Sequence, residues 1–152
     1  MDYVKIQAEA IKRKSNNSRV YEYKKDGCIY LSVNGAAIFI IPEEAYFLDL
    51  RETPFPKMMQ IFSEFNTAHH TPVELSNDRY CSDGKMLVAF KAEEHTVWFD
   101  EKILKKFGAL SQLKIVSAGE LSPAGVYDIK GNIIGIISPC RILNYGKSNQ
   151  NK

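Results

Sequence analysis

The sequence predicts an α+β domain in which two helices pack on antiparallel sheets, and three observations carry this prediction. Short stretches of alternating apolar and polar residues, typical of half-buried strands, are separated by the hairpin signals Asp26-Gly27, Asn34-Gly35 and Asp83-Gly84. The carboxyl-terminal third, from His95 to Ile142, has the pattern strand, helix, strand, strand, strand. The amino-terminal part repeats this order in weaker form.

The repeat is visible as short matches at a nearly constant offset. VKI at 4–6 matches VWF at 97–99, IKR at 11–13 matches LKK at 104–106, and IIP at 40–42 matches ISP at 137–139. We therefore predict a single domain over residues 1–143, made of two β-α-β-β-β halves. The halves span about 1–48 and 73–143, the connector spans 49–72, and a polar tail covers 144–152.

In the first half, residues 2–7 alternate well enough for a short strand, and residues 8–14 are predicted to form a helix. The SNNS run at 15–18 ends this helix, because short polar side chains compete for backbone hydrogen bonds. Three strands over 20–24, 28–33 and 36–41 then form an antiparallel meander. Pro42 ends it, because proline has no amide hydrogen to donate.

In the connector, Phe55, Met58, Met59, Phe62 and Phe65 recur at helical spacing. A helix and an irregular connector laid over the core both fit this pattern, and the two alternatives remain open. The HHTP run at 69–72 is typical of a loop, and residues 72–77 fit a short strand.

The second half continues with strands at 85–91 and 95–99. Asp100 is predicted to cap a helix that extends to Leu110. Its apolar stripe holds Ile103, Leu104, Phe107 and Leu110, with Lys102 and Lys106 on the opposite side. Strands over 113–117, 124–129 and 132–142 complete this half.

Composition excludes some functions and leaves others open. Twenty Lys and Arg residues against 18 Asp and Glu residues give a net charge of +2, so the overall charge does not indicate a nucleic-acid partner. The positive surplus lies mainly in residues 97–152. Cys28, Cys81 and Cys140 are an odd set without close spacing, which argues against a disulfide framework or a zinc site. Because neither a leader nor a membrane-length apolar run is visible, we expect a soluble cytoplasmic protein with no membrane partner.

Motifs for catalysis or cofactor binding are missing from the sequence. It contains no glycine-rich phosphate loop, no nucleophile elbow and no paired metal-ligand spacing. His69 and His70 are adjacent, so their side chains diverge, and we interpret them as a solvated loop pair. We therefore expect a protein that is not an enzyme and that has no cofactor.

The two predicted helices carry basic residues that form a candidate DNA-binding set: Lys12, Arg13, Lys14, Lys102, Lys105 and Lys106. If a pseudo-twofold axis relates the halves, both helices lie on one side of the sheet. Their cations can then contact phosphates without reading bases. The alternative is that these are ordinary solvated helix residues.

The last predicted strand is unusually apolar. Ile133, Ile134, Ile136 and Ile137 supply more apolar surface than one face of a sheet needs, and core packing explains half of them. The alternative for the rest is a groove near 139–142 that accepts a short apolar peptide.

Residues 98–142 resemble the end of the bacterial DNA sliding clamp, the beta subunit of DNA polymerase III. The matching pieces are Phe99-Asp100, EKILKKFGAL at 101–110, LKIVS at 113–117, LSP at 121–123, KGN at 130–132 and ISPCRI at 137–142. The clamp domain also consists of two β-α-β-β-β halves. The resemblance implies that both helices face DNA, that the sheets form an outer shell, and that partner peptides dock beside the last strand.

The peptide-binding set implied by this resemblance is Ser122, Pro123, Ile137, Ser138, Pro139, Cys140 and Arg141. Ser138 and Cys140 stand where the family has methionine, and the chain continues past Ile142, where the family normally ends. A clamp subunit has three such domains and this chain has room for one, so a closed ring requires a homo-oligomer of about six copies.

The resemblance implies a non-enzymatic, sliding-clamp-like accessory protein of DNA replication. Its expected partners are duplex DNA, bound without sequence preference, and replication proteins that carry clamp-binding peptides. The alternative is a protein-interaction or regulatory domain that keeps the clamp fold without binding DNA.

Overall fold

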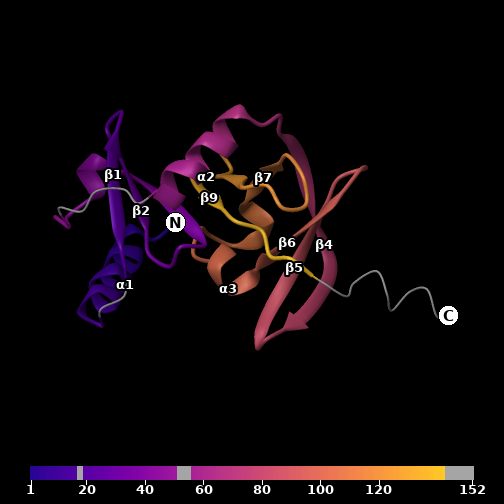
Figure 1. Cartoon of the computed structure of the whole chain (residues 1–152), viewed down its shortest axis with the longest axis horizontal. Coiled ribbons are helices and arrows are strands. Elements are labelled where there is room, and N and C mark those ends of the chain that lie inside the picture. The colour runs from indigo at the N-terminus through magenta and orange to yellow at the C-terminus, as the bar shows by residue number, and fades with distance from the viewer. Residues whose placement is uncertain (17–18, 51–55, 143–152) are drawn as a thin grey trace.

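The computed structural model describes residues 1–16, 19–50 and 56–142. Within these residues the chain forms three α-helices and one nine-stranded antiparallel sheet (Figure 1). The helices are α1 (Tyr3–Ser15), α2 (Pro56–Thr67) and α3 (Glu101–Leu104), with short 3₁₀ helices at Glu43–Ala45 and Leu110–Gln112. The strands are β1 (Tyr21–Lys25), β2 (Cys28–Ser32), β3 (Ala37–Pro42), β4 (Thr71–Ser82), β5 (Lys85–Lys91), β6 (Thr96–Asp100), β7 (Lys114–Ser117), β8 (Ala124–Tyr127) and β9 (Ile133–Ile137).

The strand order in the sheet is β1-β2-β3-β9-β8-β7-β4-β5-β6. Two meanders, β1-β2-β3 and β9-β8-β7, meet where β3 pairs with β9 through Ile38 and Ile136. Each meander follows a helix in the chain, α1 or α3, so an α-β-β-β order occurs twice. The long strand β4 pairs first with β7 and then with β5, and its register shifts between Leu75 and Arg79. Such a shift bends a strand, and here it lies within the β4–β5 pairing, just after the residues that pair with β7.

The predicted hairpin turns are confirmed. Asp26 and Gly27 between β1 and β2 have φ angles of 52° and 74°, and Asp83 and Gly84 between β4 and β5 have 49° and 73°. Positive φ at both central residues is the conformation that gives two-residue hairpins the correct twist.

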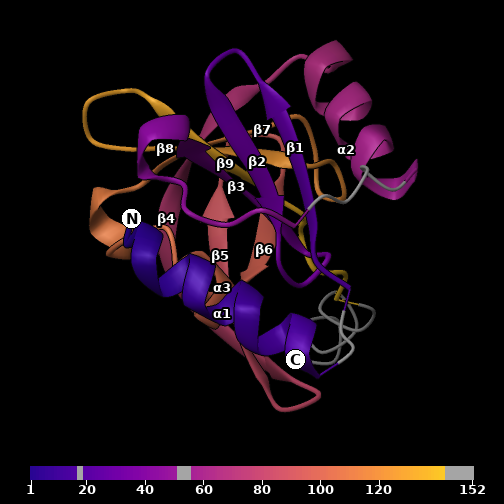
Figure 2. The same ribbon diagram turned by 90° about the vertical axis from the view of Figure 1, so that its left-hand side faces the viewer.

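The two faces of the sheet are covered by different helices. One apolar cluster contains Ile6 of α1, Leu104 of α3 and Phe39 of β3, so α1 and α3 share a face. A second cluster packs Met58 of α2 on Ile38 of β3, the neighbour of Phe39. Because successive strand residues point to opposite faces, α2 lies on the other side of the sheet from α1 (Figure 2).

The strand predicted over residues 2–7 is wrong, because the chain is helical from Tyr3 onward. Asp2 caps α1 by accepting a 3.0 Å hydrogen bond from the Lys5 amide. The helix buries Ile6 and Ala10 on one stripe, which a strand over 2–7 cannot do. The first half is therefore α-β-β-β and lacks the leading strand, whereas the second half has the predicted order, β6-α3-β7-β8-β9.

The described residues contain a third helix beside the two of the predicted fold class, because α2 occupies much of the predicted connector. Met58 and Ile61 bury their side chains against the sheet, which settles the alternatives in favour of a helix. Strand β4 begins at Thr71 and extends to Ser82, well beyond the strand predicted over 72–77. Phe55 and the predicted tail at 144–152 lie outside the described residues.

Helix α3 is shorter than predicted. The Asp100 cap is confirmed, since its carboxylate accepts hydrogen bonds from the Lys102 and Ile103 amides. After Leu104 the chain continues in turns to Phe107, and Gly108 then leaves the helical conformation with φ 150°. The long apolar stripe thus belongs to one short helix and the turns that follow it.

Gly135 allows Phe107, in the turn after α3, to pack closely on β9. A Cβ atom at this position would lie 2.1 Å from Phe107 Cε1 and 2.6 Å from the Ile38 carbonyl oxygen. We expect Gly135→Ala to lower the free energy of unfolding by about 3 kcal/mol, measured by denaturant titration, because the neighbouring backbone cannot move away. Gly119→Ala is the control, since its Cβ would meet only Ser122 Oγ at 3.6 Å. Equal stability of the two variants would contradict this packing.

Candidate nucleic-acid interface

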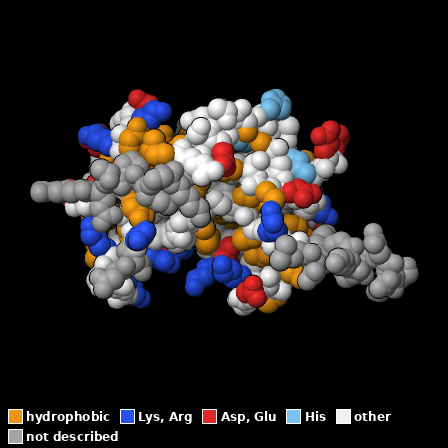
Figure 3. Space-filling model, viewed as in Figure 1, with side chains coloured by type: hydrophobic (Ala, Val, Ile, Leu, Met, Phe, Trp, Pro, Cys, Tyr) orange, Lys and Arg blue, Asp and Glu red, His pale blue; other side chains and the backbone are white. Residues whose placement is uncertain are grey.

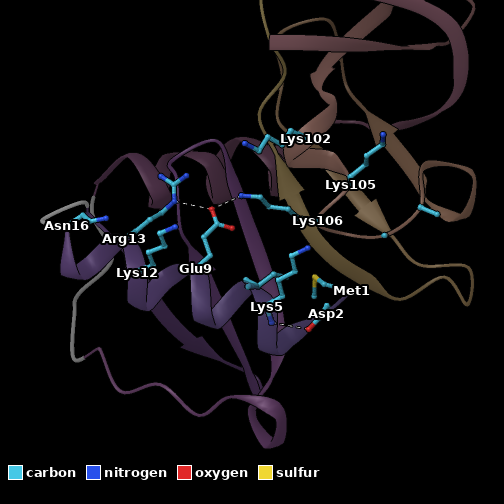
Figure 4. Close-up of a pocket in the computed structure, with 13 residues that line it drawn as sticks. Met1, Asp2, Lys5, Glu9, Lys12, Arg13, Asn16, Lys102, Lys105 and Lys106 are labelled. Atoms are coloured by element: carbon cyan, nitrogen blue, oxygen red, sulfur yellow. Dashed lines mark hydrogen bonds and ion pairs between the residues drawn. The ribbon is translucent and has the colours of Figure 1, made fainter. Parts of the chain in front are cut away.

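A hollow of about 750 Å³ lies between α1 and the α3 region, and we call it the basic groove (Figure 4). Its lining holds six basic side chains and two acidic ones. The charged residues are Asp2, Lys5, Glu9, Lys12, Arg13, Lys102, Lys105 and Lys106. Figure 3 shows Lys and Arg side chains gathered along the lower edge of the view, where Figure 1 places α1 and α3.

Burial of one face of α1 determines where its cations lie. Ile6 and Ala10 are buried in the core, and Lys5 and Lys12 lie seven residues apart on the neighbouring face. Gln7 is completely buried and fixes the helix to the segment after β3. Its Nε2 donates to the Ala45 carbonyl at 2.9 Å, and its Oε1 accepts from the Phe47 amide at 2.8 Å. These contacts orient α1 about its own axis.

The α3 side of the groove is held by its own apolar residues. Leu104 and Phe107 are buried, and the Phe107 ring lies 4.7 Å from the Phe39 ring, centroid to centroid. Lys102 and Lys105 alternate with these residues along the chain and therefore remain exposed. The core thus directs the lysines of α3 away from the sheet and toward the groove.

An ion-pair bridge crosses the basic groove. Glu9 Oε1 accepts hydrogen bonds from Arg13 Nε at 3.0 Å and from Lys106 Nζ at 2.7 Å, so it joins α1 to the α3 region (Figure 4). Burial by itself raises the pKa of Glu9, but the hydrogen bonds and charges of Lys106 and Arg13 outweigh it and lower that pKa below its ordinary value. Glu9 is therefore ionised at neutral pH.

The structure brings together most of the predicted DNA-binding set. Lys12, Arg13, Lys102, Lys105 and Lys106 all line the basic groove. Lys14 does not line it, and its Nζ donates to the Leu50 carbonyl at 3.3 Å instead.

Sequence reasoning missed Lys5 and Glu9. The predicted strand over residues 2–7 includes Lys5. A helix that begins after the Asp2 cap instead places Lys5 on the same face as Lys12. The i,i+4 spacing of Glu9 and Arg13 indicates their pairing on a helix, but the bridge to Lys106 has no local signal because that residue lies 97 positions away.

A second hollow of about 660 Å³ adjoins the basic groove. It shares Arg13, Lys102, Lys105 and Lys106 with the basic groove and adds Lys85 from the start of β5. Asp100 and Glu101 also line it, and Glu101 pairs with Lys105 at 3.4 Å. The cationic lining thus extends from α1 across α3 to the β4–β5 hairpin.

The predicted peptide-binding set is not gathered at one surface. Pro123 and Ile137 are buried, and Ser122, Ser138 and Pro139 are partly buried. Cys140 and Arg141 lie beside the edge strand β6, where the Cys140 amide donates to the Trp98 carbonyl at 2.7 Å. Burial raises the pKa of the Cys140 thiol, which favours the unreactive protonated form.

Cys140 and Arg141 do line a groove of about 670 Å³, which we call the acidic groove. Its other residues are Ala92, Glu93, Glu94, His95, Thr96, Trp98, Glu120, Leu121 and Ile142. Leu121 is 54% exposed, so an apolar side chain lies open to solvent among carboxylates. None of the residues that join Cys140 and Arg141 here belongs to the predicted set.

The described residues contain neither a metal-binding cluster nor a membrane-spanning helix. In residues 1–16, 19–50 and 56–142, no three His, Cys, Asp or Glu side chains gather into a group fit to hold a metal ion. Within those ranges, none of the helices has the length and hydrophobicity needed to cross a membrane. Comparisons with protein-family models, with curated proteins and with solved structures give no significant match to the chain.

The anchoring of α1 by Gln7 is testable. We expect Gln7→Leu to lower the free energy of unfolding by about 2–4 kcal/mol, because it leaves the Ala45 carbonyl and the Phe47 amide without their buried partner. Gln60→Leu is the matched control, since Gln60 is exposed and bonds only to Glu64 on its own helix among the described hydrogen bonds. Denaturant titration measures both, and an equally small effect for the two variants would contradict the anchoring role.

Proposed function

We propose that this chain is a non-enzymatic, sliding-clamp-like accessory protein of DNA replication. It binds duplex DNA through the basic groove, and it recognises the phosphate backbone rather than the bases. The observation that carries the proposal is the convergence of Lys5, Lys12 and Arg13 from α1 with three lysines from the α3 region on one hollow. Lysine and arginine side chains on a surface of this kind neutralise phosphates and release counterions, which gives binding that is independent of sequence.

The arrangement of the elements also supports a clamp-like interpretation. Helices α1 and α3 lie on one face of the sheet. The two meanders meet where their last strands, β3 and β9, pair with each other. The missing first strand and the cover that α2 gives to the opposite face are departures from that architecture. Helix α2 does not line the basic groove, and the helical segment that stands in place of the first strand adds Lys5 to it. The proposed contact with DNA therefore depends on α1 and the α3 region.

Charge reversal on the two sides of the groove tests the proposed contact with DNA. We expect the double variant Lys12→Glu with Lys102→Glu to bind a mixed-sequence duplex at least about tenfold more weakly at low salt. The plot of log affinity against log salt should become shallower by about 1.8, since each lost phosphate contact removes about 0.9 from the slope. Fluorescence anisotropy over a salt series measures both quantities.

The control has the same charge change outside the groove. Lys25 and Lys130 are exposed and absent from the lining of the basic groove, so Lys25→Glu with Lys130→Glu matches the variant in net charge. We expect it to keep the wild-type salt slope. Equal weakening of both variants, or no binding of duplex DNA by the wild type at low salt, would overturn the proposal.

A protein-interaction function is the second candidate, and the acidic groove favours it. Leu121 and Ile142 supply apolar surface beside the largely buried Trp98, while Glu93, Glu94 and Glu120 carry negative charge around it. This combination suits a peptide with apolar anchors and basic flanks. Under this alternative the chain captures such peptides without binding DNA.

A substitution at Leu121 tests peptide capture. We expect Leu121→Arg to weaken binding of such a peptide about tenfold or more, because the exposed apolar contact is lost. Ile129→Arg is the control, since Ile129 is 69% exposed in the β8–β9 turn and does not line the acidic groove. Isothermal titration calorimetry measures the affinities, and unchanged binding by Leu121→Arg would exclude this groove as the peptide site.

A further inference from the structure

The centre of the basic groove contains an anion held by two cations from different elements. Glu9 Oε1 lies 3.0 Å from Arg13 Nε and 2.7 Å from Lys106 Nζ. Both distances are typical of charge-assisted hydrogen bonds to an anionic oxygen. The side chains of Glu9 and Lys106 are 26% and 20% exposed, so the bridge is partly shielded from water and open on one side.

A phosphate oxygen has the same requirements as this carboxylate oxygen. It is anionic, it accepts more than one hydrogen bond, and it pairs readily with arginine and lysine together. Arg13 and Lys106 are already close enough to hold one oxygen between them. Little side-chain ordering is therefore needed for a phosphate to take the place of Glu9.

The ion-pair bridge lies where a nucleic-acid strand that occupies both hollows would contact it. Arg13 and Lys106 line both the basic groove and the second hollow that extends to Lys85. An anionic strand that runs from one hollow to the other passes over these two cations. Glu9 occupies the point that a backbone phosphate of that strand would reach.

We propose that Arg13 and Lys106 form a binding position for a backbone phosphate, and that Glu9 is the internal competitor that fills it in the free protein. Binding of DNA then requires a phosphate to displace the Glu9 carboxylate from both cations. Glu9 thereby keeps the affinity of the groove for a single phosphate low, so that only polyanions that supply several phosphates at once bind. This inference rests on the proposed function and adds a control element to the same groove.

Replacing Glu9 with glutamine removes the competing charge and keeps nearly the same shape. Because a partly exposed ion pair has a modest interaction energy, we expect Glu9→Gln to bind a mixed-sequence duplex about five- to tenfold more tightly. The salt slope should stay close to that of the wild type, because the same phosphates are contacted in both bound states and only the competition in the free protein is removed. If the bridge is purely structural, Glu9→Gln should instead bind duplex DNA more weakly, because loss of the tie between α1 and α3 would disturb the positions of the groove's cations.

The matched control removes the same charge from a distant ion pair. Glu43 pairs with Lys24 on an exposed surface and does not line the basic groove. We expect Glu43→Gln, which changes net charge by the same amount, to leave affinity within about twofold of the wild type. Thermal denaturation of both variants checks that each remains folded.

A double-mutant cycle gives a second and independent readout. Arg13 is engaged by Glu9 in the wild type, so we expect Arg13→Gln to reduce DNA affinity more in the Glu9→Gln background than in the wild type. Additive effects would contradict competition between Glu9 and the phosphate.

The outcomes separate this inference from the proposed function. Tighter binding by Glu9→Gln than by Glu43→Gln, with measurable binding by the wild type, supports the inference. If the wild type binds DNA and Glu9→Gln binds no more tightly than Glu43→Gln, the competitor role is overturned and DNA binding stands. If the wild type does not bind duplex DNA at low salt, the proposed function fails, and the inference fails with it.

Discussion

The structure depends on one apolar core that two helices share on the same face of the sheet. Ile6 and Ala10 of α1, with Leu104 and Phe107 of the α3 region, are buried in a single cluster against the strands. Because each helix buries its apolar stripe there, their basic faces lie next to each other at the margin of the core. Packing on opposite faces would leave two separate basic helices and no groove between them.

Local concentration of charge matters more in this protein than net charge. The chain carries only +2 overall, yet the basic groove has six cations against two anions. Surface charges interact mainly within about 10 Å at moderate salt, so a ligand in the groove experiences this cluster rather than the chain average. Glu9 reduces the repulsion between Arg13 and Lys106 and ties the two sides together. Under the proposed function, the same contact stabilises the groove and competes with its ligand.

Prediction from the sequence succeeded where the signals were local. The Asp26-Gly27 turn and the Asp100 cap are set by residues a few positions apart, and the structure contains both. The alternation of Val4 and Ile6 fits a strand, but of the two only Ile6 is buried in α1, and Val4 is 66% exposed. Gln7, which anchors the helix, contacts residues 38 and 40 positions away that no local pattern reveals. The repeat predicts that the basic residues of both helices share one side of the sheet, and five of the six residues of that set line the basic groove. The repeat does not predict the bridge through Glu9, because its partner Lys106 is distant in the sequence.

The most direct test of the account is a map of lysine reactivity with and without duplex DNA, read by mass spectrometry after chemical acylation. If the groove between α1 and α3 holds the phosphate backbone, DNA will slow modification of Lys5, Lys12, Lys102 and Lys105, which line it. The exposed lysines Lys25, Lys114 and Lys130 lie outside that lining and will react at the same rate in both conditions. Uniform protection of all these lysines, or protection confined to the second set, would contradict the central claim.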